Sequence, residues 1–129
     1  MKLSDVAKKH YNSGKNCAEA ILLASKEKYN LGLTCEDTEL VVGFGGGMGC
    51  GSVCGTLAGA IAVLGKMYSK REDFRPLCAK FVKEFEVALG CNSHDCRDIA
   101  KKHKNEETKC VNAVIIGADT LEKFINEQK

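Results

Sequence analysis

A stretch rich in glycine and cysteine, residues 43–55, constrains the fold of this chain more than any other part of it. Its thirteen residues include seven glycines and two cysteines, Cys50 and Cys54. Because glycine lacks a Cβ atom, such a backbone turns tightly and comes close to other groups. A run of small and apolar residues follows at once and predicts a closely packed helix. We therefore expect a close-approach loop that delivers reactive thiols to the start of a helix.

The glycines of this stretch do not have the spacing of a nucleotide-binding loop. The dinucleotide fingerprint requires glycines at positions i, i+2 and i+5. Four starting positions place glycines at i and i+2, namely Gly43, Gly45, Gly47 and Gly49. Their i+5 positions hold Met48, Cys50, Ser52 and Cys54, so none completes the fingerprint. A Gly-Lys-Ser/Thr signature is absent as well. The sequence therefore does not predict a phosphate-binding site.

Charge and hydropathy exclude several classes of function. The 129 residues carry 19 basic and 17 acidic side chains that are interspersed, so neither a nucleic-acid-binding stripe nor a charged tail is expected. No apolar run approaches the ~20 residues of a membrane helix. The first ten residues lack the apolar centre of a signal peptide. We expect a cytoplasmic protein, in a compartment that keeps thiols reduced.

Helical periodicity dominates the rest of the chain, with apolar residues recurring three and four positions apart. A capping box formed by Thr34 and Asp37 introduces one short segment. The expected helices cover residues 3–11, 17–29, 36–42, about 53–68, 76–89, 94–102 and a last segment that starts near residue 108. Residues 40–44 are also compatible with a buried strand. The sequence predicts an all-α, compact bundle of about six or seven helices in a single domain, residues 1–129.

Four cysteines fall at predicted helix starts: Cys17, Cys54, Cys96 and Cys110. The last three follow the candidate caps Ser52, Ser93 and Thr108 by two or three residues. A helix N-terminus presents unpaired N–H groups and the positive end of the helix dipole. Both favour the thiolate, which is the nucleophile and the metal ligand. We expect these cysteines to meet at one end of the bundle; the alternative is that they are small buried core residues.

The other cysteines carry weaker signals. Cys50 lies in the flexible loop and is a candidate resolving thiol or additional ligand. Cys91, His94 and Cys96 place three potential ligands within six residues, which permits half of a zinc site. Cys35 lies in a capping turn and is interpreted as an incidental thiol. Cys78 is interpreted as a core residue.

These motifs together resemble a family of small redox-active proteins named for the pattern C_GCAxxG_C_C. Residues 54–59, Cys-Gly-Thr-Leu-Ala-Gly, are similar to the family's CGAxxG element, with Thr56 in place of the alanine. Residues 44–49 resemble its glycine-rich lead-in. Its N-terminal cysteine segment and its two later cysteine sites resemble residues 11–21, 96–99 and 110–111. The resemblance covers nearly the whole chain.

The resemblance implies a redox role and places the family's recurring cysteines on the four at helix starts. The principal hypothesis is electron transfer by an iron–sulfur centre that these four thiolates hold. Backbone N–H groups of the loop would approach the cluster sulfurs, from Gly47, Gly49, Gly51 and Gly55. Two alternatives stay open. One is a cofactor-free thiol–disulfide protein in which Cys54 attacks and Cys50 or Cys17 resolves; the other is a binding module with structural zinc.

The partners expected from the sequence are few. A redox protein is the expected partner, whereas nucleic acid and membrane are not. A homo-oligomer is compatible with the sequence, because the small-residue stripe of Gly55 and Gly59 can pack within a chain or between chains. No residue is assigned a catalytic role, and the sequence does not decide whether the protein is an enzyme.

Overall fold

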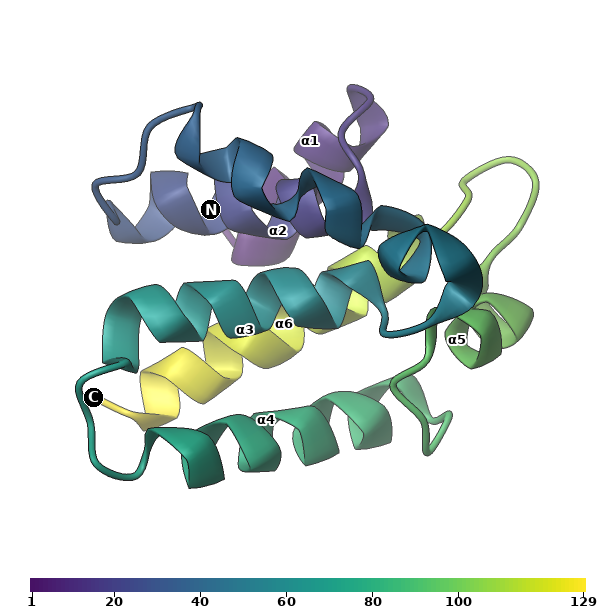
Figure 1. The fold of residues 1–129 in the computed structure, drawn as a ribbon. Coiled ribbons are helices and arrows are strands. Elements are labelled where there is room, and N and C mark those ends of the chain that lie inside the picture. Colours follow the sequence, from purple (N-terminus) through teal and green to yellow (C-terminus); the bar gives the residue numbers. More distant parts are fainter.

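The computed structural model describes all residues from 1 to 129 and consists of helices joined by turns (Figure 1). The elements are α1 (Leu3–Asn12), α2 (Cys17–Tyr29), the 3₁₀ helix η1 (Asp37–Phe44), the irregular turn η2 (Gly47–Gly51), α3 (Gly55–Tyr68), α4 (Phe74–Leu89), α5 (Cys96–His103) and α6 (Val111–Glu127). No strand forms, and only two isolated antiparallel bridges occur. The predicted all-α bundle is confirmed.

Helix α6 is the centre of the bundle. It packs against α1, α3 and α4, while α2 packs between α1 and α3 (Figure 1). The apolar faces of α4 and α6 meet at Phe81 and Phe124, whose rings contact edge to face with centroids 5.2 Å apart. Phe85 and Leu121 extend this buried layer. Burial of these large side chains fixes the position of α6, and with it the position of the loop that precedes α6.

Helices α2 and α3 approach each other closely at a glycine. A Cβ atom on Gly59 would lie 2.8 Å from the backbone oxygen of Ala18, which is closer than real Cβ contacts. Gly55, one turn earlier on α3, is also buried against a residue of α2, Cys17. The small-residue stripe is therefore confirmed as a close helix contact, and it packs within the chain.

Three predicted helix starts are displaced toward the C-terminus. Helix α3 has Cys54 rather than Ser52 at its N-cap, α5 has Asp95 rather than Ser93, and α6 begins at Val111. The first two displacements have one cause, an antiparallel bridge between Val53 and Asp95. This bridge keeps both segments extended, so neither serine can begin a helix. A second bridge, Asn105 to Lys109, delays α6 in the same way.

The segment before the glycine-rich loop is a 3₁₀ helix, and the alternative of a strand at residues 40–44 is wrong. Its predicted capping box is confirmed, because the N–H of Thr34 donates to Asp37 Oδ2 at 2.8 Å and the N–H of Asp37 donates to Thr34 Oγ1 at 3.1 Å. This local exchange of hydrogen bonds starts a helical turn. None of the helices combines the length and the apolar character that crossing a membrane requires.

Candidate functional site

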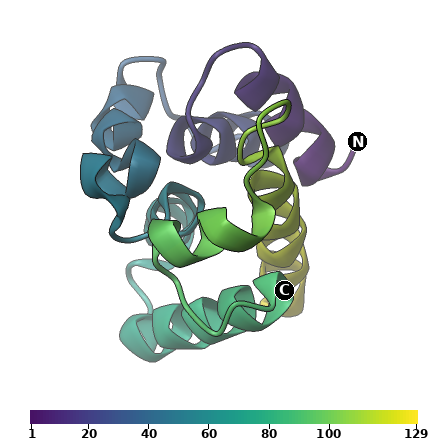
Figure 2. The same cartoon turned by 90° about the vertical axis from the view of Figure 1, so that its right-hand side faces the viewer.

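The four cysteines at predicted helix starts are at helix starts in the structure. Cys17 and Cys96 are the first residues of α2 and α5, and Cys54 and Cys110 are the N-cap residues of α3 and α6. Figure 2 looks onto the end of the molecule where α5 and the loop leading to α6 lie in front. Cys17, Cys96 and Cys110 line one open cleft of ≈ 400 Å³ there. Cys54 is buried, with 4% of its surface exposed.

Cys17 is positioned by the cap of α2. The N–H of Glu19 donates to Asn16 Oδ1 at 2.9 Å, and the N–H of Asn16 donates to Glu19 Oε1 at 3.1 Å. The Asn16 side chain also donates to the backbone oxygen of Val42 at 2.8 Å. One residue therefore starts α2 and ties it to η1, which fixes Cys17 beside the glycine-rich loop.

Cys54 and Cys96 are held together by the bridge between their segments. The N–H of Cys54 donates to the backbone oxygen of His94 at 2.8 Å. The N–H of Cys96 donates to the backbone oxygen of Ser52 at 2.5 Å. Two cysteines that are 42 positions apart in the sequence are thus set in register by backbone hydrogen bonds, as in an antiparallel ladder.

Cys110 is attached to the N-terminal part of the chain through Tyr11. The N–H of Cys110 donates to the phenolic oxygen of Tyr11 at 3.0 Å. Burial raises the pKa of Tyr11, so this hydroxyl stays protonated. The tyrosine, which also lines the cleft, thereby joins the end of α1 to the start of α6.

Two glycines bring backbone against the cysteines. A Cβ atom on Gly47, which has φ +65°, would lie 2.5 Å from Cys96 Cβ, and one on Gly55 would collide with Cys17 Sγ. Any larger residue would displace a cysteine from the site. Gly49 and Gly51 also have positive φ, but a Cβ atom on Gly49 would meet nothing and one on Gly51 would meet Arg97 rather than a cysteine of the site. The close-approach function predicted for the loop is therefore seen at Gly47 and Gly55.

Burial, rather than the helix N-termini, controls the ionisation of the thiols. Burial raises the pKa of Cys54 to about 11 and also raises the pKa of Cys17 and Cys110. Backbone N–H groups, such as that of Leu57 for Cys54 and that of Ala18 for Cys17, act in the opposite direction but are the weaker cause. The expectation that helix starts would stabilise thiolates is wrong for Cys17, Cys54 and Cys110, because desolvation outweighs the helix end.

The four thiols form one electrostatic group. After burial, the charge of Cys17 is a further cause that raises the pKa of Cys54 and Cys110. The charge of Cys96 acts in the same way on Cys17 and Cys110. The thiolates of Cys17, Cys54 and Cys110 would therefore be opposed by neighbouring cysteines in the absence of a cation. The predicted meeting of these cysteines at one end of the bundle is present in the structure, whereas their chemical role stays a prediction.

A buried hydroxyl lies beside this group. Thr56, in the first turn of α3, is 1% exposed, and its Oγ1 has no hydrogen-bond partner. Its methyl group fills the space left by Gly117 of α6, where a Cβ would collide with Thr56 Cγ2. This contact fixes the side chain. The hydroxyl is near enough to Cys17 and Cys54 to lower their pKa slightly against the larger effect of burial.

The secondary candidates do not line the cleft. Cys50 is exposed, and its thiol faces the backbone oxygen of Gly47 at 3.6 Å. Cys91 faces the backbone oxygen of Leu89 at 3.6 Å. His94 Nδ1 pairs with Glu86 Oε2 at 2.8 Å. These three residues point to separate partners, and no three His, Cys, Asp or Glu side chains in the structure are arranged to hold a metal ion.

Sequence analysis missed three residues that position the site. Asn16 has a detectable signal, because Asn16 and Glu19 have the spacing of a capping box. Tyr11 has none, since its partner is 99 positions away. Thr56 can be recognised in the sequence only as a departure from the CGAxxG element, and its burial can be recognised only in the folded structure.

Comparison with known proteins gives one match. The model of the family described as "Putative redox-active protein (C_GCAxxG_C_C)" matches residues 15–124. The matched segment includes all four cysteines of the site and most of the chain. No curated protein and no solved structure matches the chain. The protein therefore belongs to the C_GCAxxG_C_C family of redox-active proteins.

Proposed function

We propose that this protein transfers electrons through an iron–sulfur cluster held by Cys17, Cys54, Cys96 and Cys110. One observation carries the proposal: three thiols from helix starts line one cleft, and the buried fourth, Cys54, is close enough to Cys17 for their charges to interact. Four cysteine thiolates are the usual ligand set of [2Fe–2S] and [4Fe–4S] centres.

The redox character of the family favours a cluster over a structural zinc ion. Four thiolates can hold either group. Zinc has no redox chemistry, whereas the family that matches this chain is described as redox-active. An iron–sulfur cluster accepts and releases electrons, so it accounts for both the donor set and the family.

The buried thiol of Cys54 favours ligation over nucleophilic attack. With a pKa of about 11, roughly one Cys54 in ten thousand is a thiolate at neutral pH. Such a group is a poor nucleophile toward an external disulfide, since the thiolate is the reacting species. A metal ligand loses its proton when it binds, and the bound cation removes the repulsion between neighbouring thiolates.

The residues around the cysteines have roles in this account. A bound cluster would accept and release electrons at this end of the bundle. Cys54 and Thr56 exclude water from the inner side, because both are almost fully buried. Gly47 and Gly55 let backbone lie against Cys96 and Cys17. Burial and nearby hydrogen-bond donors are the properties by which proteins tune cluster potential.

The test is reconstitution of the purified protein with ferrous iron and sulfide under anaerobic conditions. We expect charge-transfer absorption in the visible range, with matching iron and acid-labile sulfide contents. Cys17→Ser, Cys54→Ser, Cys96→Ser and Cys110→Ser should each weaken or abolish this absorption. Cys35→Ser and Cys78→Ser are matched controls, since neither cysteine lines the cleft, and they should retain it.

Two results would contradict the proposal. A colourless protein without iron, whose cleft cysteines exchange rapidly with disulfides, would indicate a cofactor-free thiol–disulfide protein instead. Stoichiometric zinc without iron would indicate a structural metal site.

A further inference from the structure

The mouth of the cysteine cleft is lined by positive charge alone. Lys15, Lys104 and Lys109 line the cleft together with Cys17, Cys96 and Cys110, and no Asp or Glu does so. The lysines come from the turn before α2 and from the loop between α5 and α6. Two segments of the chain thus place three ammonium groups around the thiols, without a counter-charge in the lining.

Most of this charge is not neutralised by neighbours. Lys104 and Lys109 take part in no ion pair, and all three lysines are exposed. Lys15 has one distant contact, 4.0 Å from Glu19 Oε2. Burial raises the pKa of Cys110, and Lys104 is the charge that opposes this rise. The field of Lys104 therefore reaches the thiol of Cys110.

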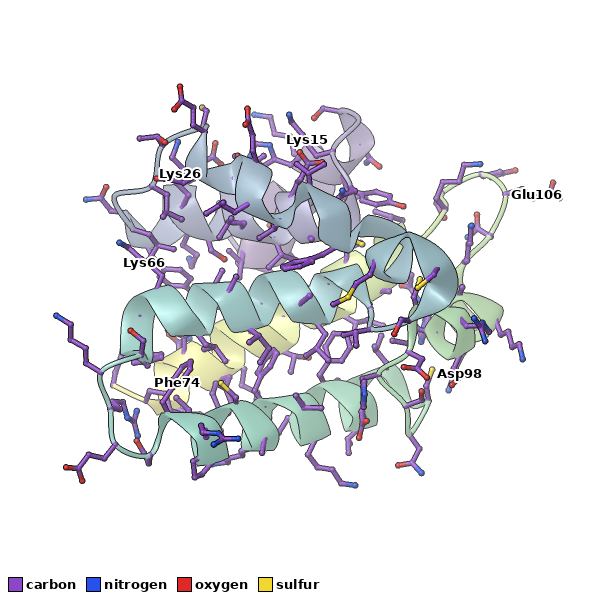
Figure 3. The ribbon with its side chains drawn as sticks, in the orientation of Figure 1. Lys15, Lys26, Lys66, Phe74, Asp98 and Glu106 are labelled. Atoms are coloured by element: carbon purple, nitrogen blue, oxygen red, sulfur yellow. The ribbon has the colours of Figure 1, made fainter.

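The other surface hollows differ in charge. One, at the end of α3, is lined by Lys66, Lys70 and Arg71 without an acidic residue, although Arg71 pairs with Asp73. The cleft between α4 and α6 is lined by Lys83 and Lys123 but also by Glu84 and Asp119. Near the cysteine cleft, the acidic residues of the α5–α6 loop do not line the opening. Glu106 lies at the outer end of that loop, as Figure 3 shows, whereas Lys15 lines the cleft. What distinguishes the cysteine cleft is that its positive rim surrounds thiols.

We propose that this rim is the docking surface for the acidic face of an electron-transfer protein. The inference rests on the proposed function and names the partner's chemistry. Three of the four cysteines line this cleft and Cys54 is buried, so the cleft is where the cysteine group meets solvent. A ring of lysines at such an opening attracts a carboxylate-rich surface and orients it.

The test uses an acidic [2Fe–2S] ferredoxin and a basic cytochrome c as probe proteins. Binding of each to the metal-free, reduced protein is measured at about 20 mM and about 300 mM salt. We expect the ferredoxin to bind at low salt and to dissociate at high salt, and the cytochrome not to bind. In the double variant Lys104→Glu/Lys109→Glu, ferredoxin binding should fall about tenfold or more.

The matched control is Lys83→Glu/Lys123→Glu, which makes the same change of charge on exposed lysines of α4 and α6. Lys123 lies 13 residues along α6 from Cys110, which is about 20 Å. This variant should bind the ferredoxin as the natural protein does. Equal loss in both double variants, or no loss in either, would overturn the proposal.

A second measurement distinguishes a docking surface from a pocket for small anions. DTNB, a disulfide with two carboxylates, and dithiodipyridine, a neutral disulfide, are allowed to react with the cleft cysteines. The Lys104→Glu/Lys109→Glu variant should lose about tenfold more rate with DTNB than with dithiodipyridine. Both reagents slow to some extent, because loss of Lys104 raises the pKa of Cys110 further, and the difference between them reports the attraction of the carboxylates. Slower DTNB reaction without any ferredoxin binding would overturn the docking proposal and indicate a small-anion site. Both measurements use the metal-free protein, so they do not depend on a cluster. Failure of the cluster proposal is recognised separately, because the reconstituted protein would then show no visible absorption.

Discussion

At the scale of single residues, the site depends on side chains whose properties are set by burial. Cys54 and Thr56 follow each other closely at the start of α3, and both are nearly inaccessible to water. Burial makes the thiol hard to ionise and leaves the hydroxyl without a partner. Burying a polar group without a partner costs free energy in the metal-free protein. Both residues belong to the cysteine group or lie beside it.

The unpaired hydroxyl of Thr56 should destabilise the metal-free protein. Thr56→Val keeps the shape and removes the buried hydroxyl, so we expect the free energy of unfolding to rise by about 1 kcal/mol. Urea unfolding of the metal-free protein measures this change. Thr56→Ser is the control, because it keeps the hydroxyl and loses the methyl contact with Gly117, and it should be less stable than the natural protein. A loss of stability in Thr56→Val would show that the hydroxyl is satisfied.

Cys54 should make the stability of the metal-free protein fall at alkaline pH. Burial raises its folded-state pKa from the ordinary 9.0 to about 11, so the folded state holds the proton more tightly than the unfolded state does. The associated stability is complete below pH 9 and is lost as the pH rises through about 11. The loss is roughly 2–3 kcal/mol.

Unfolding by urea across this pH range, under reducing conditions, measures the effect. Cys54→Ser is the reference, because serine does not ionise there while all other titrating groups remain. The difference in stability between the two proteins should shrink as the pH rises. Two parallel curves would contradict a raised pKa for Cys54.

At the scale of elements, close contacts between backbones position the helix starts. Gly59 allows α3 to lie against Ala18 of α2, and Gly55 allows it to lie against Cys17. The bridge between Val53 and Asp95 then sets the start of α3 beside the start of α5. Close contacts of the main chain thus position three of the four cysteines, Cys17, Cys54 and Cys96.

The close contact of α2 with α3 predicts a difference between two glycines of one helix. In Gly59→Ala the new methyl would lie 2.8 Å from the oxygen of Ala18, so the helices must separate, and we expect a loss of about 1–3 kcal/mol in the free energy of unfolding. In Gly65→Ala the nearest atom is 3.9 Å away, at Phe74. That variant should be neutral or more stable by up to about 1 kcal/mol, because alanine favours helix. Similar effects of both variants on thermal unfolding would contradict this packing.

The element scale also shows what sequence reasoning could not reach. Apolar periodicity predicted the helices because it reports a local property, the side of a helix that faces the core. The caps of α3 and α5 could not be predicted, since the bridge that displaces them joins segments about 40 positions apart. The sign of the thiol pKa shifts was mispredicted for the same reason. A helix start can be recognised in a sequence, whereas the burial that outweighs it is a result of the whole fold.

At the scale of the whole molecule, the bundle has one chemically distinct end. Helices α2, α3, α5 and α6 begin around the cysteine group, and the aromatic layer of Phe81, Phe85 and Phe124 lies in the core of the bundle. The convergence of the four cysteines was predictable, because a family resemblance and helix starts identified the same residues. The lysine rim was not, since Lys15 and Lys104 are 89 positions apart and meet only in the folded chain.

The central claim is that the four cysteines hold an iron–sulfur cluster, and the X-ray absorption spectrum at the iron edge of the reconstituted protein tests it most directly. The account predicts that each bound iron has sulfur neighbours at about 2.3 Å and at least one iron neighbour, and that Cys54→Ser alters this environment while Cys78→Ser does not. Iron with nitrogen or oxygen neighbours and no second iron, or no retained iron at all, would contradict it.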